Sequence, residues 1–337
     1  MGGGAAAWEL ARRGLRVLLI EKGRGDFPQG GPQQIAIEPE AADHRLAMGR
    51  WPSRIRAGID GRTSDVWPSL GCGLGGSSTL YGAALGRMES IDFEPRRLEN
   101  GTQVNWPFRY PDLEPYYLRA EEIMRVCGGV DSLNRKAKYE LRSPPAMSDN
   151  DRFFFGAMQQ SGLHPYRIHV SIDYLPDCTE CGGHVCARDC KGDARNRFVE
   201  PAVRNFGLSV RTRTEVDRLE LDARNVAGVW VQDKSKTGVS SEPELIRARV
   251  VVLAAGALFT PVVLQKSVSE KFPHGVGNDA DLVGRYLMFH ASDFIAAYPR
   301  GRHDRSGPSR TLALRDFYEV DGEKLGEIQS TGLSAGY

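Results

Sequence analysis

The sequence predicts an α/β fold built around a Rossmann-like domain. Three observations predict it: a helix, a glycine, a strand and an acidic residue in succession over residues 5–21, a glycine- and serine-rich segment over residues 71–82, and an apolar run over residues 249–256. Short apolar runs are typical of parallel strands that are buried on both faces. Together the three segments indicate a nucleotide-binding architecture.

The N-terminal helix is predicted over residues 5–13, because this run contains strong helix formers throughout. Gly14 follows as a left-handed C-cap, and the helix dipole favours the arginines of the last turn. Residues 15–20 then form a short apolar strand with Glu21 at its tip. An acidic residue at the tip of the second strand of a βαβ unit holds a ribose hydroxyl. Glu21 is therefore a candidate nucleotide ligand, the alternative being a solvated strand-end charge.

The glycines before this helix match only the last part of the fingerprint G-x-G-x-x-G. Counted back from Leu10, the third glycine falls on Gly3, so the first two glycines and the strand before them would precede residue 1. We therefore expect the chain to begin inside its own nucleotide motif. The alternative is an unusual short N-terminus without a nucleotide site.

The second glycine segment begins at Gly71 and contains two adjacent serines. Backbone N–H groups exposed by glycines can line a diphosphate, and serine hydroxyls add donors. A glycine–serine run alone is more often a flexible loop, so the N-terminal unit is what favours the binding interpretation. The candidate cofactor-binding residues in this segment are Gly71, Gly75, Gly76, Ser77, Ser78, Tyr81 and Gly82.

The remaining segments differ in character from one another. Residues 92–130 are rich in proline and aromatic residues and include an amphipathic helix over residues 113–126. Alternating patterns predict half-buried strands over residues 208–212, 216–221 and 226–232. The apolar run 249–256 predicts a fully buried strand that returns to the nucleotide sheet, which would bring Ala255 and Gly256 to the cofactor.

Length and composition fit a globular protein with two interleaved domains. The 337 residues suit one large or two ordinary domains. A formal net charge of +1 without a basic stripe gives no indication of a nucleic-acid partner. The longest apolar run, residues 250–259, is too short for a transmembrane segment. We expect residues 1–90 and 193–290 to form the nucleotide-binding domain, and residues 91–192 and 291–337 to form a substrate or cap domain.

Four of the six cysteines form a cluster with the spacing C-x2-C-x4-C-x3-C, at Cys178, Cys181, Cys186 and Cys190. Three interpretations are open. The thiolates could hold an iron–sulfur cluster, they could hold a structural Zn²⁺ ion, or they could pair as disulfides in an oxidising compartment. All four residues are therefore candidate metal ligands.

In these segments the chain resembles the glucose–methanol–choline (GMC) oxidoreductases. The shared features are Glu21 at the tip of a strand, the glycine–serine segment 71–82, and a later segment, 256–267, of the form G-A-x-x-S/T-P followed by apolar residues and serine. Smaller matches lie at residues 106–107, 110–117, 277–279 and 283–285. Tyr81 departs from the family, which usually has Asn or His at this position. The resemblance extends over almost the whole chain.

The resemblance implies an FAD/NAD(P)-binding Rossmann-like three-layer domain with an interleaved α+β substrate domain built on an antiparallel sheet. It implies FAD as the cofactor, with Val216 at the adenine. The implied reaction is oxidation of a CH–OH group of an alcohol or sugar-like substrate by hydride transfer to flavin N5. In certain sugar dehydrogenases of the family, a comparable cysteine-rich segment carries an iron–sulfur cluster. Such a cluster in this chain would pass electrons to an electron-acceptor protein.

No residue is assigned as catalytic. In the family, a catalytic histidine and its partner lie in a C-terminal segment that nothing after Ser267 matches, so we expect these residues beyond residue 337. Two other interpretations are a catalytically inactive fragment and a degenerate nucleotide-fold protein stapled by a zinc or disulfide cysteine cluster.

Overall fold

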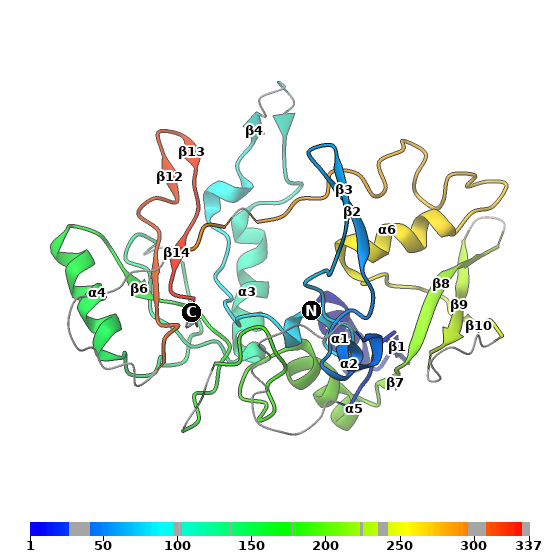
Figure 1. Ribbon diagram of the computed structural model, residues 1–337, viewed down its shortest axis with the longest axis horizontal. Helices are drawn as coiled ribbons and strands as arrows, with labels where there is room; N and C mark the ends of the chain where they lie inside the picture. Colours follow the sequence, from blue (N-terminus) through cyan, green and yellow to red (C-terminus); the bar gives the residue numbers. More distant parts are fainter. Residues whose placement is uncertain are drawn as a thin grey trace. The chain divides into compact units, whose positions relative to one another are not determined.

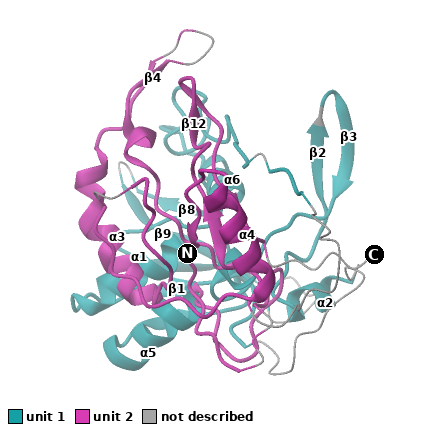
Figure 2. Ribbon diagram, turned by 90° about the vertical axis from the view of Figure 1, so that its left-hand side faces the viewer, with its two compact units in different colours: residues 1–80, 194–298 teal, residues 81–193, 299–337 magenta. Residues whose placement is uncertain are grey.

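The structure is a computed structural model, and it describes residues 1–26, 41–97, 101, 103–134, 137–176, 178, 180–222, 225–234, 242–290, 292–295 and 308–331. The chain divides into two compact units, shown in different colours in Figure 2. Unit 1 comprises Met1–Leu80 and Ala194–Tyr298, and unit 2 comprises Tyr81–Asp193 and Pro299–Tyr337. Each unit is therefore built from two separate stretches of the sequence.

Unit 1 contains helices and both parallel and antiparallel strand pairs (Figure 1). Its helices are α1 (Gly2–Arg12), α2 (Ala42–Ala47), the 3₁₀ helix η1 (Gly76–Thr79), the π-helix η3 (Arg195–Val199), α5 (Glu200–Phe206) and α6 (Gly256–Lys266). Its strands are β1 (Leu18–Ile20), β2 (Ile55–Ile59), β3 (Arg62–Val66), β7 (Ser209–Arg211), β8 (Thr214–Leu221), β9 (Val226–Asp233) and β10 (Glu244–Arg247).

The N-terminal helix α1 starts earlier than the sequence predicts. Its first turn begins at Gly2, so the glycines expected to lead into the helix are part of it. Gly14 adopts the predicted left-handed conformation, with φ +80°. α1 packs on α5 and η3, where Ala7, Ala11 and Ala202 are buried. Because these side chains are small, the helix backbones approach closely, which positions the first turn of α1 within unit 1.

The predicted strands of unit 1 form two sheets. β1 pairs with β7 in parallel, Leu18 opposite Ser209, so the apolar run after Gly14 forms a parallel strand as predicted but with only three residues. β8, β9 and β10 form an antiparallel sheet in the order β10-β9-β8, which confirms the half-buried strands predicted there. The amide of Thr214, at the start of β8, donates to the carbonyl of Glu21, at the end of β1. The two sheets are therefore joined at Glu21.

The prediction of a fully buried strand over residues 249–256 is wrong. In the described part of the chain these residues pair with no strand, and Val250 and Val252 are 77% and 56% exposed. Val251 and Leu253 pack against the apolar core beneath the antiparallel sheet. The alternating apolar side chains are thus covered on one face only, because no described strand lies beside this segment to bury the other face.

Unit 2 is built on short strands and two longer helices. Its helices are the 3₁₀ helix η2 (Ser90–Phe93), α3 (Tyr110–Met124) and α4 (Asp149–Gln160). Its strands are β4 (Arg96–Arg97), β5 (Gln103–Val104), β6 (Tyr166–Arg167), β11 (Leu312–Leu314), β12 (Glu319–Val320), β13 (Glu323–Lys324) and β14 (Ile328–Gln329). The predicted helix over residues 113–126 is α3. The order β14-β11-β6 is antiparallel throughout, which confirms the antiparallel sheet of the second domain.

The core of unit 2 lies around this sheet and includes a buried ion pair. Ile168, Val170 and Ile172 follow β6 and form a buried cluster. Nearby, the guanidinium of Arg87 donates to both carboxylate oxygens of Glu121 at 2.6 Å, with both side chains under 5% exposed. No helix among the described residues is long and apolar enough to cross a membrane.

Candidate functional site

The carboxylate of Glu21 and the glycine loop lie together in unit 1. Oε1 of Glu21 accepts the amide N–H of Gly23 at 2.7 Å and that of Gly73 at 3.1 Å. The amide of Leu74 also donates to the carbonyl of Arg24 at 2.7 Å. Two segments that the sequence singles out separately, about fifty residues apart, are therefore joined around one carboxylate.

Glycines are required where these two segments meet. A Cβ on Gly23 would lie 2.4 Å from the amide nitrogen of Gly73, and a Cβ on Gly71 would lie 2.5 Å from the carbonyl carbon of Gly76. Both contacts are with backbone atoms, which cannot rotate away as a side chain can. Gly75 and Gly76 have φ values of +100° and +57°, so the loop turns through conformations that favour glycine.

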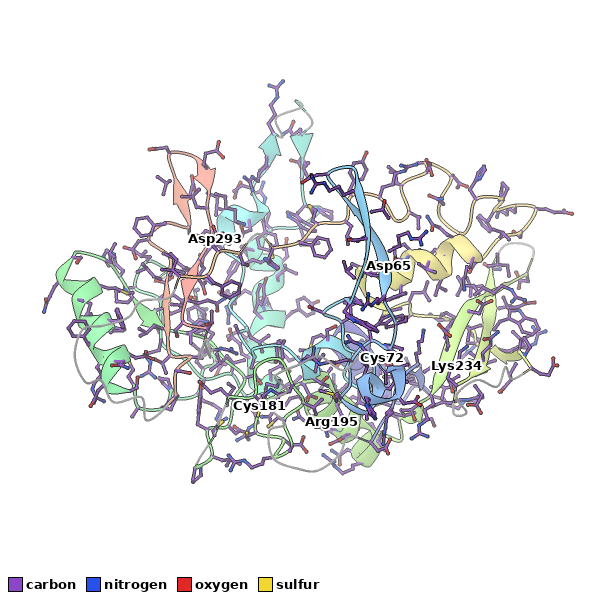
Figure 3. The ribbon with its side chains drawn as sticks, viewed as in Figure 1. Asp65, Cys72, Cys181, Arg195, Lys234 and Asp293 are labelled. Atoms are coloured by element: carbon purple, nitrogen blue, oxygen red, sulfur yellow. The ribbon has the colours of Figure 1, made fainter. Side chains whose placement is uncertain are left out.

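The serines of the loop bind the loop itself. The Ser78 hydroxyl donates to the carbonyl of Gly75 at 2.6 Å and accepts the amide of Ala194 at 3.0 Å. Oγ of Ser77 accepts the amide of Gly71 at 3.0 Å. Ser78 thus ties the loop to the entry of the π-helix η3, whose first residue, Arg195, is labelled in Figure 3. The Ser78 hydroxyl proton is therefore used in the hydrogen bond to the carbonyl of Gly75.

Two helix N-termini lie near each other in unit 1. A Cβ on Gly3 in the first turn of α1 would lie 3.0 Å from Cβ of Ala254, and Ala255 is the N-cap residue of α6. Neither helix has a side-chain cap hydrogen bond. Uncapped N-terminal N–H groups and the positive end of the helix dipole favour a bound anion such as a diphosphate. Gly256 adopts φ +80° at the start of α6.

The other predicted cofactor residues divide between the two units. Val216 lies on β8, two residues after Thr214, which is hydrogen-bonded to Glu21. Tyr81 and Gly82 belong to unit 2. The Tyr81 hydroxyl donates to the carbonyl of Gly192 at 2.6 Å, and a Cβ on Gly82 would overlap the guanidinium of Arg310. The structure therefore brings Gly3, Glu21, the loop residues up to Ser78, Val216, Ala255 and Gly256 into one unit.

Burial sets the electrostatics of this site. Burial raises the pKa of Glu21, and the hydrogen bonds from Gly23 and Gly73 oppose that rise. Burial, together with the nearby Glu21 carboxylate, raises the pKa of the Cys72 thiol to about 12. Cys72 lies within the glycine loop (Figure 3). Its thiol is therefore protonated at neutral pH, and it serves as a small buried side chain.

Sequence reasoning missed two contributors to the site. Gly23 allows the close crossing with Gly73, and Ala194 anchors Ser78. The only local sign of Gly23 is its place two residues after Glu21, and nothing in the sequence near Ala194 indicates its partner. These roles arise from contacts between segments distant in the sequence.

The cysteine cluster lies in unit 2, with Cys181 labelled in Figure 3. The sulfur of Cys190 lies 3.3 Å from that of Cys186 and 3.9 Å from that of Cys178. In the described part of the chain, no group of three or more His, Cys, Asp or Glu side chains is arranged to hold a metal ion. The iron–sulfur and zinc assignments of these thiols therefore stay predictions.

A buried lysine fixes the loop that carries these thiols. The Lys191 ammonium donates to the carbonyls of Tyr81, Cys181 and His184 at 3.1, 2.7 and 2.8 Å. Burial lowers the pKa of Lys191 to about 8. The Glu180 carboxylate, next to Cys181, accepts hydrogen bonds from the amides of Ser309 and Arg310.

These features define one unit with parallel and antiparallel strand pairs and a second unit with antiparallel strands. Comparison with known proteins gives the family of the chain. A family model described as GMC oxidoreductase matches residues 58–292. The 6'''-hydroxyparomomycin C oxidase of Streptomyces lividus is 30% identical over 335 residues, covering 94% of this chain and 59% of that protein. The paromamine 6'-oxidase of Streptomyces fradiae is also 30% identical, covering 94% and 58%.

The chain belongs to the GMC oxidoreductase family. It spans about three fifths of the length of the curated relatives it matches, 59% and 58%. A solved structure of a fungal aryl-alcohol oxidase superposes with a TM-score of 0.52 at 16% identity, covering 79% of this chain and 46% of that one. This likeness shows the fold, and it confirms the mixed α/β class predicted from the sequence. The family supports FAD as the cofactor.

Proposed function

We propose that unit 1 binds FAD and that the protein oxidises a CH–OH group of an alcohol or sugar-like substrate. The observation that carries the proposal is the junction at Glu21, where one partly buried carboxylate holds the glycine loop just after β1. An acidic residue at this place in a βαβ unit is suited to a ribose hydroxyl. The uncapped starts of α1 and α6 lie in the same unit and suit a diphosphate.

The residues present fit an FAD molecule. Oε1 of Glu21 holds the loop, and its other carboxylate oxygen, Oε2, would accept a ribose hydroxyl. Gly3 and Gly256 would allow the diphosphate to approach the backbone, and the Gly71–Gly76 loop would cover it. FAD, when bound, supplies the hydride acceptor. The protein supplies position and a dry, fixed set of dipoles around the cofactor.

The named relatives support the substrate class. Two relatives at 30% identity are named as oxidases of paromamine and of 6'''-hydroxyparomomycin C. We therefore propose a hydroxyl group on a sugar-like molecule as the substrate, with oxidation to a carbonyl. The acceptor of the electrons is a second part of the proposal. An iron–sulfur cluster on the thiols of unit 2 would imply an electron-acceptor protein, and its absence would favour oxygen.

The first test is an absorption spectrum of the purified chain, repeated on the supernatant after acid denaturation. A flavin spectrum released into the supernatant is expected. A colourless protein that also takes up no added FAD would refute FAD binding and favour the inactive or degenerate alternatives. A broad background that acid bleaches would reveal an iron–sulfur cluster.

The second test separates binding from turnover. The flavin-loaded chain is mixed anaerobically with paromamine, with a simple primary alcohol and with buffer alone. Loss of flavin absorbance near the visible maximum with an alcohol, and with no change in buffer, would support oxidation of that alcohol by residues of this chain. A chain that retains flavin but is bleached by no alcohol would limit the proposal to cofactor binding.

A further inference from the structure

The cysteine cluster of unit 2 has an arrangement that the proposed FAD site does not use. The sulfur atoms follow one another in a line: Cys178 contacts Cys190, and Cys190 contacts Cys186, at 3.9 and 3.3 Å. Beyond them, Cys186 is also hydrogen-bonded to the buried Cys181. Cys186 and Cys190 are 2% and 4% exposed, whereas Cys178 is partly exposed. One thiol that solvent can reach is therefore followed by two that solvent cannot reach.

The backbone around Cys190 is held firmly. The amide of Asp173 donates to the carbonyl of Cys190 at 2.7 Å, and Ile172 pairs with Lys191 in an isolated bridge. The Lys191 ammonium binds the Cys181 carbonyl on the other side of the loop. The thiols therefore face one another because the loop is fixed, and the sulfur pairs need to close by only about 1 to 2 Å to reach the bond length of a disulfide.

The side chain beside the cluster has another role. Glu180 precedes Cys181, but its carboxylate accepts the amides of Ser309 and Arg310 at 3.0 Å and the hydroxyl of Ser309 at 2.6 Å. It is thus committed to the segment before β11 and does not join the thiols. The groups that face one another at Cys190 are sulfur atoms, and paired thiols have a reversible two-electron oxidation to a disulfide.

We propose that Cys178, Cys190 and Cys186 form a thiol relay that a hydroperoxide oxidises, with Cys178 as the entry point and a Cys186–Cys190 disulfide as the end product. The proposal does not depend on FAD binding. Its physical basis is the exposure gradient along the line of sulfur atoms, because a small oxidant meets Cys178 first. The disulfide would then be stored where solvent does not reach it.

Three steps balance the reaction. The Cys178 sulfur attacks one peroxide oxygen, the O–O bond breaks, and a sulfenic acid and one water form. The Cys190 sulfur attacks the Cys178 sulfur, an S–S bond forms, and the sulfenic hydroxyl leaves with the Cys190 proton as a second water. The Cys186 sulfur then attacks Cys190 and displaces Cys178, which takes up the Cys186 proton. Two electrons pass from Cys186 and Cys190 to the peroxide.

The test uses the chain as purified, reduced and desalted without oxygen. Iron, zinc and acid-labile sulfide are measured first, and thiols are then counted in denaturant before and after a small excess of hydrogen peroxide. A loss of two thiols from the six of the chain, reversed by dithiothreitol, is expected. Stoichiometric metal on these thiols, or no loss of thiols, would overturn the proposal.

Peptide mapping locates the bond. Trypsin cleaves after Arg188, so Cys190 lies in the tripeptide 189–191 and the other three cysteines of the cluster lie in the peptide 168–188. Cleavage after Glu180 separates Cys178 from Cys186. The resulting peptide, residues 181–188, contains both Cys181 and Cys186. Fragmentation between these two cysteines in the mass spectrometer is expected to place the link to the tripeptide on Cys186 after full oxidation. A linkage to Cys181, or only intermolecular linkages, would refute the relay.

Variants test the order of the steps. Cys178→Ser is expected to slow disulfide formation about tenfold or more, because the two remaining thiols are buried. Cys186→Ser should stop the reaction at a Cys178–Cys190 disulfide, and Cys190→Ser should leave a sulfenic acid on Cys178 that dimedone traps. Cys127→Ser, a buried cysteine outside the cluster, is the matched control and should react like the parent. Oxidation of Cys178→Ser at the parental rate would overturn the assignment of Cys178 as the entry point.

Discussion

Replacing Gly23 with alanine tests whether the crossing beneath the glycine loop builds the cofactor site. The new Cβ would lie 2.4 Å from the amide nitrogen of Gly73, and 2.5 and 2.7 Å from the carbonyl carbon and oxygen of Cys72. Favourable contacts between carbon and other heavy atoms begin near 3.5 Å, so the loop must move by about 1 Å. All three contacts are with backbone atoms, so no side-chain rotation relieves them.

The displacement has two energetic consequences. Overpacking of this kind costs about 1–3 kcal/mol. A shift of about 1 Å also breaks the 3.1 Å hydrogen bond from Gly73 to Glu21, and a buried group left without its partner costs a further 1–3 kcal/mol, roughly. We therefore expect a loss of about 2–6 kcal/mol. In a domain of roughly 150–250 residues, this loss lowers Tm by about 4–24 °C.

The assay is thermal unfolding together with the flavin content after gel filtration. Gly58→Ala is the matched control in the same unit, because the nearest atom to its new Cβ is the carbonyl oxygen of Arg62 at 4.0 Å; its stability should stay within about 0.5 kcal/mol of the parent. A Gly23→Ala protein with parental Tm and flavin content would show that the crossing is not needed to hold the loop.

Three further predictions follow from buried and partly buried groups. Glu21→Gln should weaken FAD binding about 10- to 100-fold, measured by titration, because the variant loses a charged hydrogen-bond acceptor. Burial raises the pKa of Glu21, so the native state holds the Glu21 proton more tightly than the unfolded state does. The parent protein should therefore lose stability as pH rises above about 4.5, and the variant should lose less. Glu121→Gln should lower the free energy of unfolding by about 3 kcal/mol or more in a denaturant titration, since it leaves the Arg87 guanidinium buried without its counter-charge. Asp65→Asn, at an exposed ion pair, is the control and should cost under about 1 kcal/mol in the same titration. Cys72, with its pKa near 12, should resist iodoacetamide at pH 8 in the folded protein and react in denaturant, and fast labelling of the folded protein would contradict its burial.

The sequence predicted those parts of the fold that depend on neighbouring residues. The helix ending at Gly14, the parallel strand before Glu21 and the antiparallel strands after residue 213 are present. Each is set by local rules: side-chain conformational preferences, a glycine able to adopt positive φ, and the two-residue period of a strand. The glycine segments and the acidic residue were enough to indicate the family.

The tertiary structure decided how these parts are used. It placed Gly23 beneath Gly73, committed the Ser78 hydroxyl to Gly75, and left one face of residues 250–253 exposed. It also arranged the sulfur atoms of the cysteine cluster in a line through Cys190. The crossing of Gly23 and Gly73 is not visible in the sequence, because it joins segments that meet only when the chain folds. Contacts between near neighbours, such as Ser78 with Gly75, are not visible either, because spacing alone does not say which atoms meet.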